Sequence, residues 1–339
     1  MLVAVGACYL DTILTTSHYP EEDEKLRASS VSRRRGGNCP NTLEVLAQLV
    51  SQQDAQDQLR LGLITVLPAR SSPASQLIQS ELGSRVSLEH CVYREGFEDP
   101  GSCYIIRSQS TGSRTIVNYN NLPDFTLKEL EEKSDRLGST ASWFHFEGRI
   151  PDITLLTMRH LRRQFPWVRI SVEIEKSGRS GLQALAEEAD VVFYAKSWAL
   201  VSDIVEWHKA QVKVDLSIGQ GAGYKTAEEC LHAQAALAPS SSLLCCTWGQ
   251  DGASALQPAN GNLVYAPAFT VEGFQVIDLS PIGAGDTFIA GMLYGLTCRD
   301  TEWGLAQKLA FATQLAGMKV SQEGFTGLHR VLVSMKCPL

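Results

Sequence analysis

Short apolar segments alternate along the chain with longer segments whose apolar residues recur at helical spacing. Apolar residues line one face of a predicted helix at residues 40–50 and of another at residues 287–296. The strand-like segments are residues 3–8, 60–64, 170–174, 190–194, 243–246 and 274–278. Strands and helices that alternate in this way predict an α/β fold with a mainly parallel sheet.

Two regions do not follow the alternation and predict a small second β layer. Residues 8–35 are polar and β-branched, and residues 103–106 and 114–117 flank a turn-like Ser-Thr-Gly-Ser stretch, as in a hairpin. We expect these pieces to form a small sheet over one edge of the main sheet. The segment 215–226 is expected to be a flexible insert, because it contains Gly219, Gly221 and Gly223. Its Gly-Gln-Gly at 219–221 lacks the full spacing of a dinucleotide-binding loop and a convincing strand before it.

Composition and charge narrow the class of protein. The 339 residues are 44% hydrophobic and 20% charged, which is typical of a globular chain rather than a disordered or fibrous one. The net charge of −7 is well mixed and no basic stripe stands out, which argues against binding to nucleic acid. No apolar run reaches the roughly 18 residues that a membrane span needs. The length fits either two domains or one large α/β domain.

The cysteines favour a reducing compartment. There are nine of them, irregularly spaced and without a Cys-x-x-Cys, which argues against a disulfide scaffold and against a zinc site. Cys245 and Cys246 are adjacent inside an apolar run that looks like a buried strand. The N-terminal apolar segment is too short for a signal peptide and lacks its basic flank. We therefore expect a cytoplasmic protein.

The sharpest candidate for chemistry is the run Gly283-Ala284-Gly285-Asp286, which lies between a predicted strand and a predicted helix. The glycines allow a tight turn, and the backbone N–H groups at a helix N-terminus favour a bound anion. A carboxylate there could take a proton from a substrate hydroxyl while the amides stabilise a developing phosphoryl charge. Asp286 could equally be a simple helix cap. The residues alone leave both interpretations open.

Other polar residues are weaker candidates. Gly36-Gly37-Asn38, with Asn41 one helical turn later, could let a polar ligand approach closely and hydrogen-bond its hydroxyls, or could be an ordinary turn and helix start. Asp11 and Asp23 lie in the predicted β layer, where a carboxylate could accept hydrogen bonds from sugar hydroxyls or be a surface acid. Arg114 could meet a phosphate as a bidentate donor or be a solvated side chain.

Together these motifs resemble the ribokinase-like (PfkB) carbohydrate kinases, and within that family the ketohexokinases, also called fructokinases. Gly36-Gly37-Asn38 resembles the first family signature, and Gly283-Ala284-Gly285-Asp286 resembles the second. The supporting stretches are residues 10–13, 19–23, 35–38 with Asn41, 113–117, 143–149 and 172–176, and Gly317 with residues 324–325. The resemblance runs from about residue 3 to residue 328.

The resemblance implies a fold and an organisation of the chain. The fold would be the three-layer ribokinase-like α/β fold, with a mainly parallel central sheet flanked by helices. Residues 1–330 would form a single PfkB carbohydrate kinase domain, with a β lid from about 9–35 and 91–121. Residues 331–339 would be a C-terminal tail. The lid could also pair two subunits into a homodimer.

The resemblance also implies roles for individual residues. Asp286 would be the base that takes the proton of the sugar hydroxyl, and the amides of Gly283, Ala284 and Gly285 would form the anion hole. The residues that would bind the sugar are Asp11, Asp23, Gly37, Asn38 and Asn41, and Arg114 would reach toward the sugar and the transferred phosphate. The residues that would border the ATP pocket are Trp248, Gly249, Gly252, Gly283, Gly285 and Gly317. Mg²⁺ would accompany ATP, with its protein ligands unassigned.

Three departures from the family pattern bear on these implications. The usual Asp-Thr before the second signature is replaced here by Ser280-Pro281, and Asp278 lies two residues too early, which puts K⁺ binding in doubt. Pro281 also removes one amide donor. The Asn-x-x-Glu magnesium motif of the wider family is absent, and Lys196-Ser197-Trp198-Ala199 stands near its usual place, as in the ketohexokinases. Residues 199–223 form a longer stretch than in the relatives.

The resemblance therefore predicts an ATP-dependent sugar kinase that acts on a ketohexose such as fructose. Two alternatives remain open. The first is a kinase for another small polyol or a nucleoside, against which Asn38 weighs because the adenosine-type relatives usually carry Ser at that place. The second is a non-catalytic descendant that binds a sugar or a nucleotide, against which the retained Asp286 weighs.

Overall fold

The computed structural model describes residues 1–53, 59–201, 223–270 and 282–332. Several sequence expectations lie outside these residues: the strand at 274–278, Asp278, Ser280 and Pro281, most of the segments 199–223 and 215–226, and most of the tail at 331–339. Within the described ranges, no helix combines the length and the hydropathy that a bilayer crossing requires.

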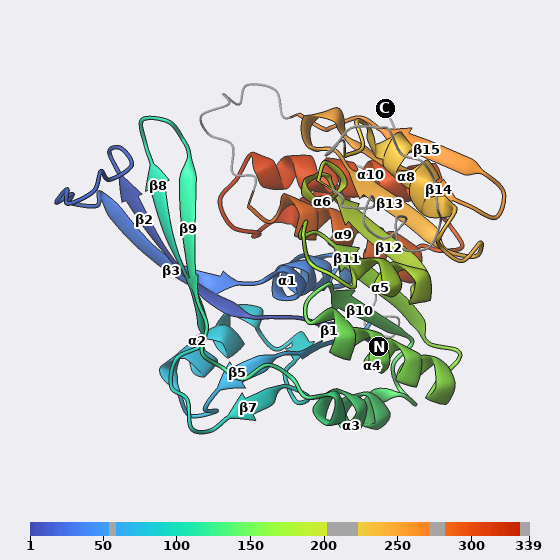
Figure 1. Ribbon diagram of the computed structural model, residues 1–339, viewed down its shortest axis with the longest axis horizontal. Helices are drawn as coiled ribbons and strands as arrows, with labels where there is room; N and C mark the ends of the chain where they lie inside the picture. The colour runs from blue at the N-terminus through green and yellow to red at the C-terminus, as the bar shows by residue number, and fades with distance from the viewer. Residues whose placement is uncertain (54–58, 202–222, 271–281, 333–339) are drawn as a thin grey trace, which may run out of the picture.

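A large, mainly parallel sheet forms the middle layer of the molecule (Figure 1). The strand order is β15-β14-β13-β12-β11-β10-β1-β4-β6. The strands are β1 (Leu2–Val5), β4 (Leu61–Ile64), β6 (Val86–Ser87), β10 (Trp143–Glu147), β11 (Arg169–Ile174), β12 (Val191–Ala195), β13 (Leu243–Thr247), β14 (Ala253–Gln257) and β15 (Asn262–Ala266). All neighbours are parallel except β13–β14 and β14–β15. The predicted α/β architecture is confirmed.

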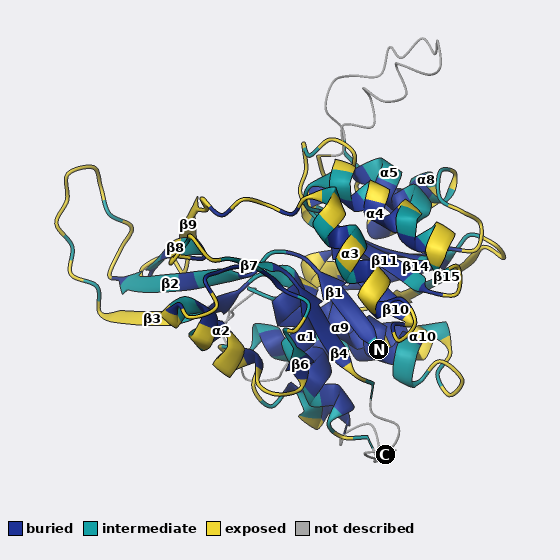
Figure 2. Cartoon of the chain, turned by 90° about the horizontal axis from the view of Figure 1, so that it is seen from below, coloured by how far each residue is buried: buried dark blue, intermediate teal, exposed yellow. Residues whose placement is uncertain are grey.

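Helices cover both faces of this sheet and give the molecule three layers. One face carries α1 (Asn38–Val50), α2 (Pro73–Leu82), α9 (Ala284–Cys298) and α10 (Leu305–Val320). The other carries α3 (Leu127–Leu137), α4 (Pro151–Gln164), α5 (Leu182–Glu188) and α8 (Ala227–Ala235). Successive side chains of a strand point to opposite faces, so Leu2 and Ala4 join one apolar core while Val3 and Val5 join the other. Figure 2 shows this buried interior between the helical layers.

A four-stranded sheet projects from one side of the three-layer body, and we call it the lid (Figures 1 and 2). Its order is β3-β2-β8-β9, from β2 (Tyr9–Thr16), β3 (Ser30–Gly36), β8 (Gly101–Ser108) and β9 (Arg114–Tyr119). The expected hairpin is present as β8 and β9. One part of the expected lid lies elsewhere, because β7 (Val92–Arg94) pairs with β5 (Val66–Pro68) in a separate two-stranded sheet. Pro100, which has no N–H to donate, stands directly before β8.

The helices that matter for the site begin earlier than periodicity predicted. Helix α1 begins at Asn38 rather than at residue 40, and α9 begins at Ala284 rather than at residue 287. In both cases a glycine with a positive φ precedes the helix: φ is 107° at Gly37 and 80° at Gly283. These backbone angles suit glycine and end the preceding segment abruptly. The polar residues that follow each glycine are therefore helical, in the first turn.

Candidate active site

The carboxyl-terminal ends of β1, β10 and β11 meet the first turns of α1 and α9. In open parallel sheets, ligands bind at this edge. The contact is close because a Cβ added at Gly37 would lie 2.2 Å from the carbonyl oxygen of Ala7, just after β1. A side chain at Gly6 would likewise meet Cys39 of α1 and Glu147 of β10. Only glycine at these two positions lets the strand ends and α1 approach so closely.

Asp286 is buried in the first turn of α9 and is held there by α1. Its Oδ2 accepts a hydrogen bond of 2.7 Å from Nδ2 of Asn41, and its backbone carbonyl accepts one of 3.2 Å from the hydroxyl of Thr42. The carboxylate therefore has a fixed orientation. The sequence suggests that Asn41 lies away from the Gly-Ala-Gly-Asp loop, but the structure brings the side chains of Asn41 and Asp286 into direct contact.

The surroundings of Asp286 favour its protonated form. Burial is the largest effect and raises the pKa of Asp286 to about 7. The hydrogen bond from Asn41 opposes the rise, the charges of Glu175 and Glu147 add to it, and the charge of Arg35 opposes it. A carboxylate whose pKa lies near neutral pH can accept a proton from a hydroxyl and release it again. A solvated helix cap has no need of such a pKa.

The first backbone amides of α9 have no acceptor within the helix. The first intrahelical bond runs from the N–H of Thr287 to the carbonyl of Gly283, at 2.9 Å, so the amides of Ala284 and Gly285 have no partner within the helix. Among the described residues, which leave out 271–281 just before this turn, no side chain caps α9 and no atom would lie within 4 Å of a Cβ at Gly285. Gly283 is instead packed against the ring of Phe325. This geometry suits an anion that sits on the helix N-terminus.

A row of glutamates lines the sheet edge opposite Asp286. Glu147 and Glu173 are register partners at the ends of β10 and β11. Asn38 donates from Nδ2 to the two oxygens of Glu173, at 3.0 and 3.1 Å, and to Glu175 at 3.0 Å. Burial raises the pKa of Glu173 well above its usual range, and the charges of Asp286, Glu175 and Glu147 raise it further. Asn38 therefore ties the start of α1 to this acidic row.

Sequence reasoning assigned no role to these three glutamates, although they lie in stretches that resemble the family. A signal was present in the chain, because Glu173 interrupts an apolar strand between Val172 and Ile174. An acid in a strand whose neighbours are buried must find a hydrogen-bond partner or a ligand at the sheet edge. The register that places Glu147 beside it could not be obtained without the fold.

Asp11 of the lid also lies at this site. Its side chain is buried against Gly36, where an added Cβ would be 2.5 Å from Oδ1. Asp11 and Arg34 are register partners across β2 and β3, and Arg34 Nε lies 3.7 Å from Asp11 Oδ2. Burial raises the pKa of Asp11, and the charge of Arg34 opposes this rise. The lid thus places a carboxylate and a guanidinium beside the glycine pair.

Asp23 and Arg114 lie farther out on the lid. Asp23 is exposed, has a φ of 63°, and belongs to the loop between β2 and β3, at the end of the lid remote from α9 (Figures 1 and 2). Arg114 begins β9 opposite Arg107. Partial burial, followed by the charge of Arg34, lowers the pKa of Arg114. Within one chain, the structure does not bring Asp23 to Asp286.

Of the residues expected to border ATP, Trp248, Gly249 and Gly252 lie between β13 and β14, Gly317 lies on α10, and Gly283 and Gly285 lie at the start of α9. Trp248 is buried directly before a short 3₁₀ turn, Gly249–Asp251, and Lys196 Nζ lies 5.4 Å from its ring centroid. A Cβ at Gly252 would be 2.1 Å from the carbonyl oxygen of Ala266. Similarly, a Cβ at Gly317 would be 2.2 Å from the carbonyl oxygen of Phe269. These two glycines therefore have a packing role, whatever else they do.

The described part of the chain contains no group of three or more His, Cys, Asp or Glu side chains arranged to hold a metal ion. The carboxylates of Glu173 and Glu175 are engaged by Asn38. Mg²⁺ often binds to one or two carboxylates together with substrate phosphates and water, rather than in a cage of protein ligands.

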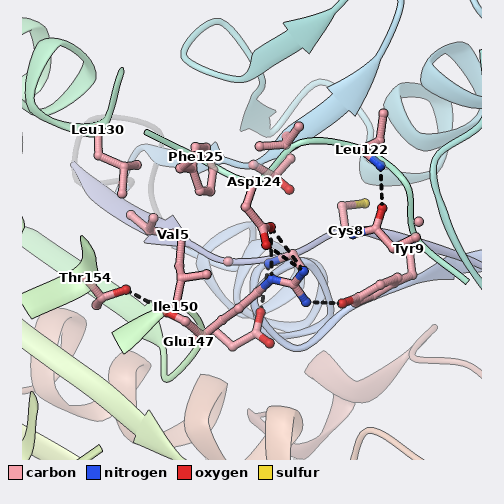
Figure 3. A pocket seen from close by; sticks show the side chains of 17 residues that line it. Val5, Cys8, Tyr9, Leu122, Asp124, Phe125, Leu130, Glu147, Ile150 and Thr154 are labelled. Atoms are coloured by element: carbon pink, nitrogen blue, oxygen red, sulfur yellow. Dashed lines mark hydrogen bonds and ion pairs between the residues drawn. The ribbon is translucent and has the colours of Figure 1, made fainter. Parts of the chain in front are cut away.

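A small recess lies next to the acidic row, between the start of the lid and the α3–α4 side of the sheet. Tyr9 and Asp124 line this recess (Figure 3), and Arg149 donates hydrogen bonds to both of them. Glu147 lines it and accepts a hydrogen bond of 2.8 Å from the N–H of Ala7. None of the predicted catalytic or substrate-binding residues lines this recess.

Comparison with known proteins agrees with this geometry. Residues 1–329 match the model of the pfkB family carbohydrate kinases. Ketohexokinase from Mus musculus is 30% identical over 334 residues, which cover 96% of this chain and 98% of that protein. The sequence resemblance to this family is confirmed.

Solved structures support the same fold. Ribokinase from Giardia lamblia aligns with a TM-score of 0.73 at 17% identity, covering 99% of this chain and 98% of that one. Arabidopsis thaliana ribokinase, complexed with ribose and ATP, aligns with a TM-score of 0.72 at 17% identity, covering 99% of each chain. Each has a fold like that described here. Because the family match spans nearly all of the sequence, the chain belongs to the pfkB family of carbohydrate kinases.

Proposed function

We propose that the protein is an ATP-dependent kinase that phosphorylates a ketohexose such as fructose, with Asp286 as the general base. The observation that carries the proposal is the placement of Asp286, a buried carboxylate beside helix amides that have no acceptor within their own helix. The identity to a ketohexokinase supports the substrate class. The lid carboxylate of Asp11 supports a substrate rich in hydroxyl groups.

The reaction would be an in-line phosphoryl transfer. The sugar oxygen would attack the γ-phosphorus of ATP, the bond from that phosphorus to the β,γ-bridging oxygen would break, and ADP would leave. The hydroxyl proton would pass to Asp286. The amides of Gly283, Ala284 and Gly285 would stabilise the charge on the transferred group, where fixed dipoles are most effective. Mg²⁺, bound with ATP, would neutralise the phosphate oxygens.

The sugar would lie between the lid and the first turn of α1. Asp11 and the backbone at Gly37 would contact its hydroxyls, and Asn38 would do so while it remains tied to Glu173. Asn41 donates one Nδ2 hydrogen to Asp286 and keeps the other for a hydroxyl, because an amide carries two donors. Arg114 would approach the transferred phosphate as the lid closes.

The nucleotide would lie on the other side of the α9 turn. Trp248, Gly249, Gly252 and Gly317 would border the adenine and ribose. Gly283 and Gly285 would face the phosphates.

The eight cysteines in the described residues are all free, which agrees with the proposed cytoplasmic location.

The lid offers a surface for a second copy of the chain. Strand alternation places Val31, Tyr104, Val117 and Tyr119 on the same face of the lid, and these side chains are 50–64% exposed. An exposed apolar sheet face of this kind marks an interaction site. We propose that it forms a homodimer, so Val117→Asp should yield monomers in light scattering. Asp23 would reach a sugar only through lid movement or from the second copy.

A coupled ADP-release assay tests the proposed function. Wild type is assayed with ketohexoses, aldoses, polyols and a nucleoside, with and without Mg²⁺, and Asp286→Asn is the control. The proposal expects Mg²⁺-dependent turnover that is fastest with a ketohexose. Turnover with only a polyol or a nucleoside would overturn the substrate class. Tight sugar binding without turnover would identify a non-catalytic binding protein.

A further inference from the structure

We infer that Arg35 is a positioning residue that orients and tunes Asp286 through the side chain of Asn41. The inference rests on the proposed function, in which Asp286 acts as the base. The three residues come from the end of β3, the first turn of α1 and the first turn of α9. They form a chain of hydrogen bonds from the lid to the reacting carboxylate.

The guanidinium of Arg35 is enclosed at the base of the lid. Its residue is 2% exposed, and Nη1 donates to Oδ1 of Asn41 at 3.0 Å. Nη2 donates to Glu44, one turn further along α1, in an ion pair. The backbone N–H of Arg35 donates to Glu81 of α2 at 2.7 Å. Arg35 is therefore fixed from two helices.

This placement settles which way the amide of Asn41 points. A guanidinium can only donate hydrogen bonds, so the atom of Asn41 that faces Arg35 must be the oxygen. The nitrogen then faces Asp286, where Nδ2 lies 2.7 Å from Oδ2. The reversed amide would present its NH₂ group to a cation and its oxygen to a carboxylate. Arg35 thus guarantees that Asn41 donates to the base.

Arg35 also places a positive charge near Asp286, where most of the neighbouring ionisable groups are carboxylic acids. The groups that face Asp286 are Glu147 from β10, Glu173 from β11, Glu175 directly after β11, the Cys39 thiol from α1, Lys319 from α10 and Arg35 from β3. The carboxylates favour protonated Asp286. Arg35 favours the ionised form directly, and Asn41 does so through its hydrogen bond. Without Arg35, less of the base would be ionised at neutral pH.

Substitutions of Arg35 and of its ion-pair partner Glu44 should shift the pH dependence of kcat in opposite directions. Arg35→Gln removes the cation, so the acidic limb of the kcat–pH profile should move to higher pH. Activity on that limb should fall on the order of tenfold, with a smaller loss on the plateau. Glu44→Gln keeps Arg35 and removes the carboxylate that neutralises it, so the limb should move to lower pH. A purely structural role for Arg35 predicts lower stability without these opposed shifts.

Arg33 provides the matched control. It lies two residues earlier on β3, on the same face as Arg35, and it is exposed. Arg33→Gln should leave the pH profile and the KM for ATP unchanged. If the acidic limb of the kcat–pH profile lies at the same pH in Arg35→Gln, Glu44→Gln and wild type, the inference is wrong. The same holds if Arg33→Gln shifts the limb as far as Arg35→Gln does.

A measurement without turnover separates this inference from the proposed function. The Asp286 carboxyl is followed by ¹³C NMR in protein labelled at aspartate, with its signal assigned from Asp286→Asn. Its titration midpoint should rise in Arg35→Gln and fall in Glu44→Gln. If Arg35→Gln does not fold, Glu44→Gln alone carries the test. If the midpoints shift in a protein that phosphorylates no sugar, the role of Arg35 stands and the proposed kinase activity is rejected. If the midpoints do not shift in an active kinase, the role of Arg35 is rejected and the kinase activity stands.

Discussion

Asn38 donates its side-chain amide to both carboxylate oxygens of Glu173, at 3.0 and 3.1 Å, across 135 positions of sequence. This contact joins the first residue of α1 to the end of β11. It places an amide of the first signature against an acid whose ionised form is disfavoured by burial and by neighbouring carboxylates. The site is therefore a network of acids and amides in which each amide holds a carboxylate.

Asp286→Asn should reduce kcat on the order of 10²–10⁴-fold while sugar binding survives. The amide keeps the shape of the side chain but cannot accept the hydroxyl proton, and loss of a general base typically has an effect of this size. Steady-state assays and sugar-binding calorimetry check the two parts. Activity within threefold of wild type would remove Asp286 from the mechanism.

Compared with wild type, Asp286→Asn should become more stable as the pH rises. The pKa of Asp286 is about 7 in the folded protein against an ordinary value of 3.8, so ionisation opposes folding. The destabilisation in wild type therefore grows between about pH 4 and pH 7 and is constant above that range. Urea unfolding at pH 5 and pH 8 should show Asp286→Asn gaining on wild type at the higher pH. A loss of stability that is equal at both values would support a helix-cap role.

The kcat/KM of wild type for the sugar should fall as the pH drops through about 7, because the base of the free enzyme must be ionised to accept a proton. A pH–rate profile at constant ionic strength and sugar concentrations well below KM measures this limb. A rate that stays level down to pH 5 would show that the ionisation of Asp286 does not control turnover.

Glu173→Gln and Glu173→Ala should behave differently. Gln resembles the protonated acid and retains an oxygen that accepts from Asn38, so stability should change little. Ala leaves the half-buried amide of Asn38 without this acceptor, which should lower the free energy of unfolding by about 1–3 kcal/mol. Glu173→Ala should also raise the KM for the sugar more than the KM for ATP. Equal effects of the two substitutions would show that the hydrogen bond is unimportant.

Asp11→Asn should raise the KM for the sugar about tenfold and leave the KM for ATP nearly unchanged. A hydrogen bond to a charged group contributes about 1.5–3 kcal/mol, and the substitution removes the charge while keeping the size of the side chain. Initial rates at varied sugar and varied ATP separate the two constants. A change confined to the KM for ATP would place Asp11 on the nucleotide side.

Activity should be nearly independent of K⁺ when K⁺ is replaced by a large inert cation at fixed ionic strength. Ser280 and Pro281, which lie outside the described residues, stand where relatives carry an Asp and a Thr, and a hydroxyl is a weaker ligand for an alkali cation than a carboxylate. Strong K⁺ activation that disappears in Asp278→Ala would instead show that Asp278 replaces the missing acid.

The sequence predicted the parallel sheet and both signature helices because strands such as residues 170–174 and helices such as residues 287–296 carry strong local periodicity. The hydrogen bond between Asn41 and Asp286 spans 245 positions of sequence and had no local signal. The pairing of Glu147 with Glu173 depends on strand register and has no local signal. Arg35 shows the same limit, because it shares a strand face with exposed Arg33 and is buried only where α1 and α2 cover it.

A single residue, Gly37, separates the last residue of β3 from the first residue of α1. The Ala7 carbonyl oxygen occupies the space beside Gly37, 2.2 Å from where a Cβ would lie. In the proposed mechanism, a tilt of the lid would therefore be passed directly to the first turn of α1, which carries Asn41. Lengthening this joint by one residue would separate such a tilt from the alignment of Asn41 with Asp286.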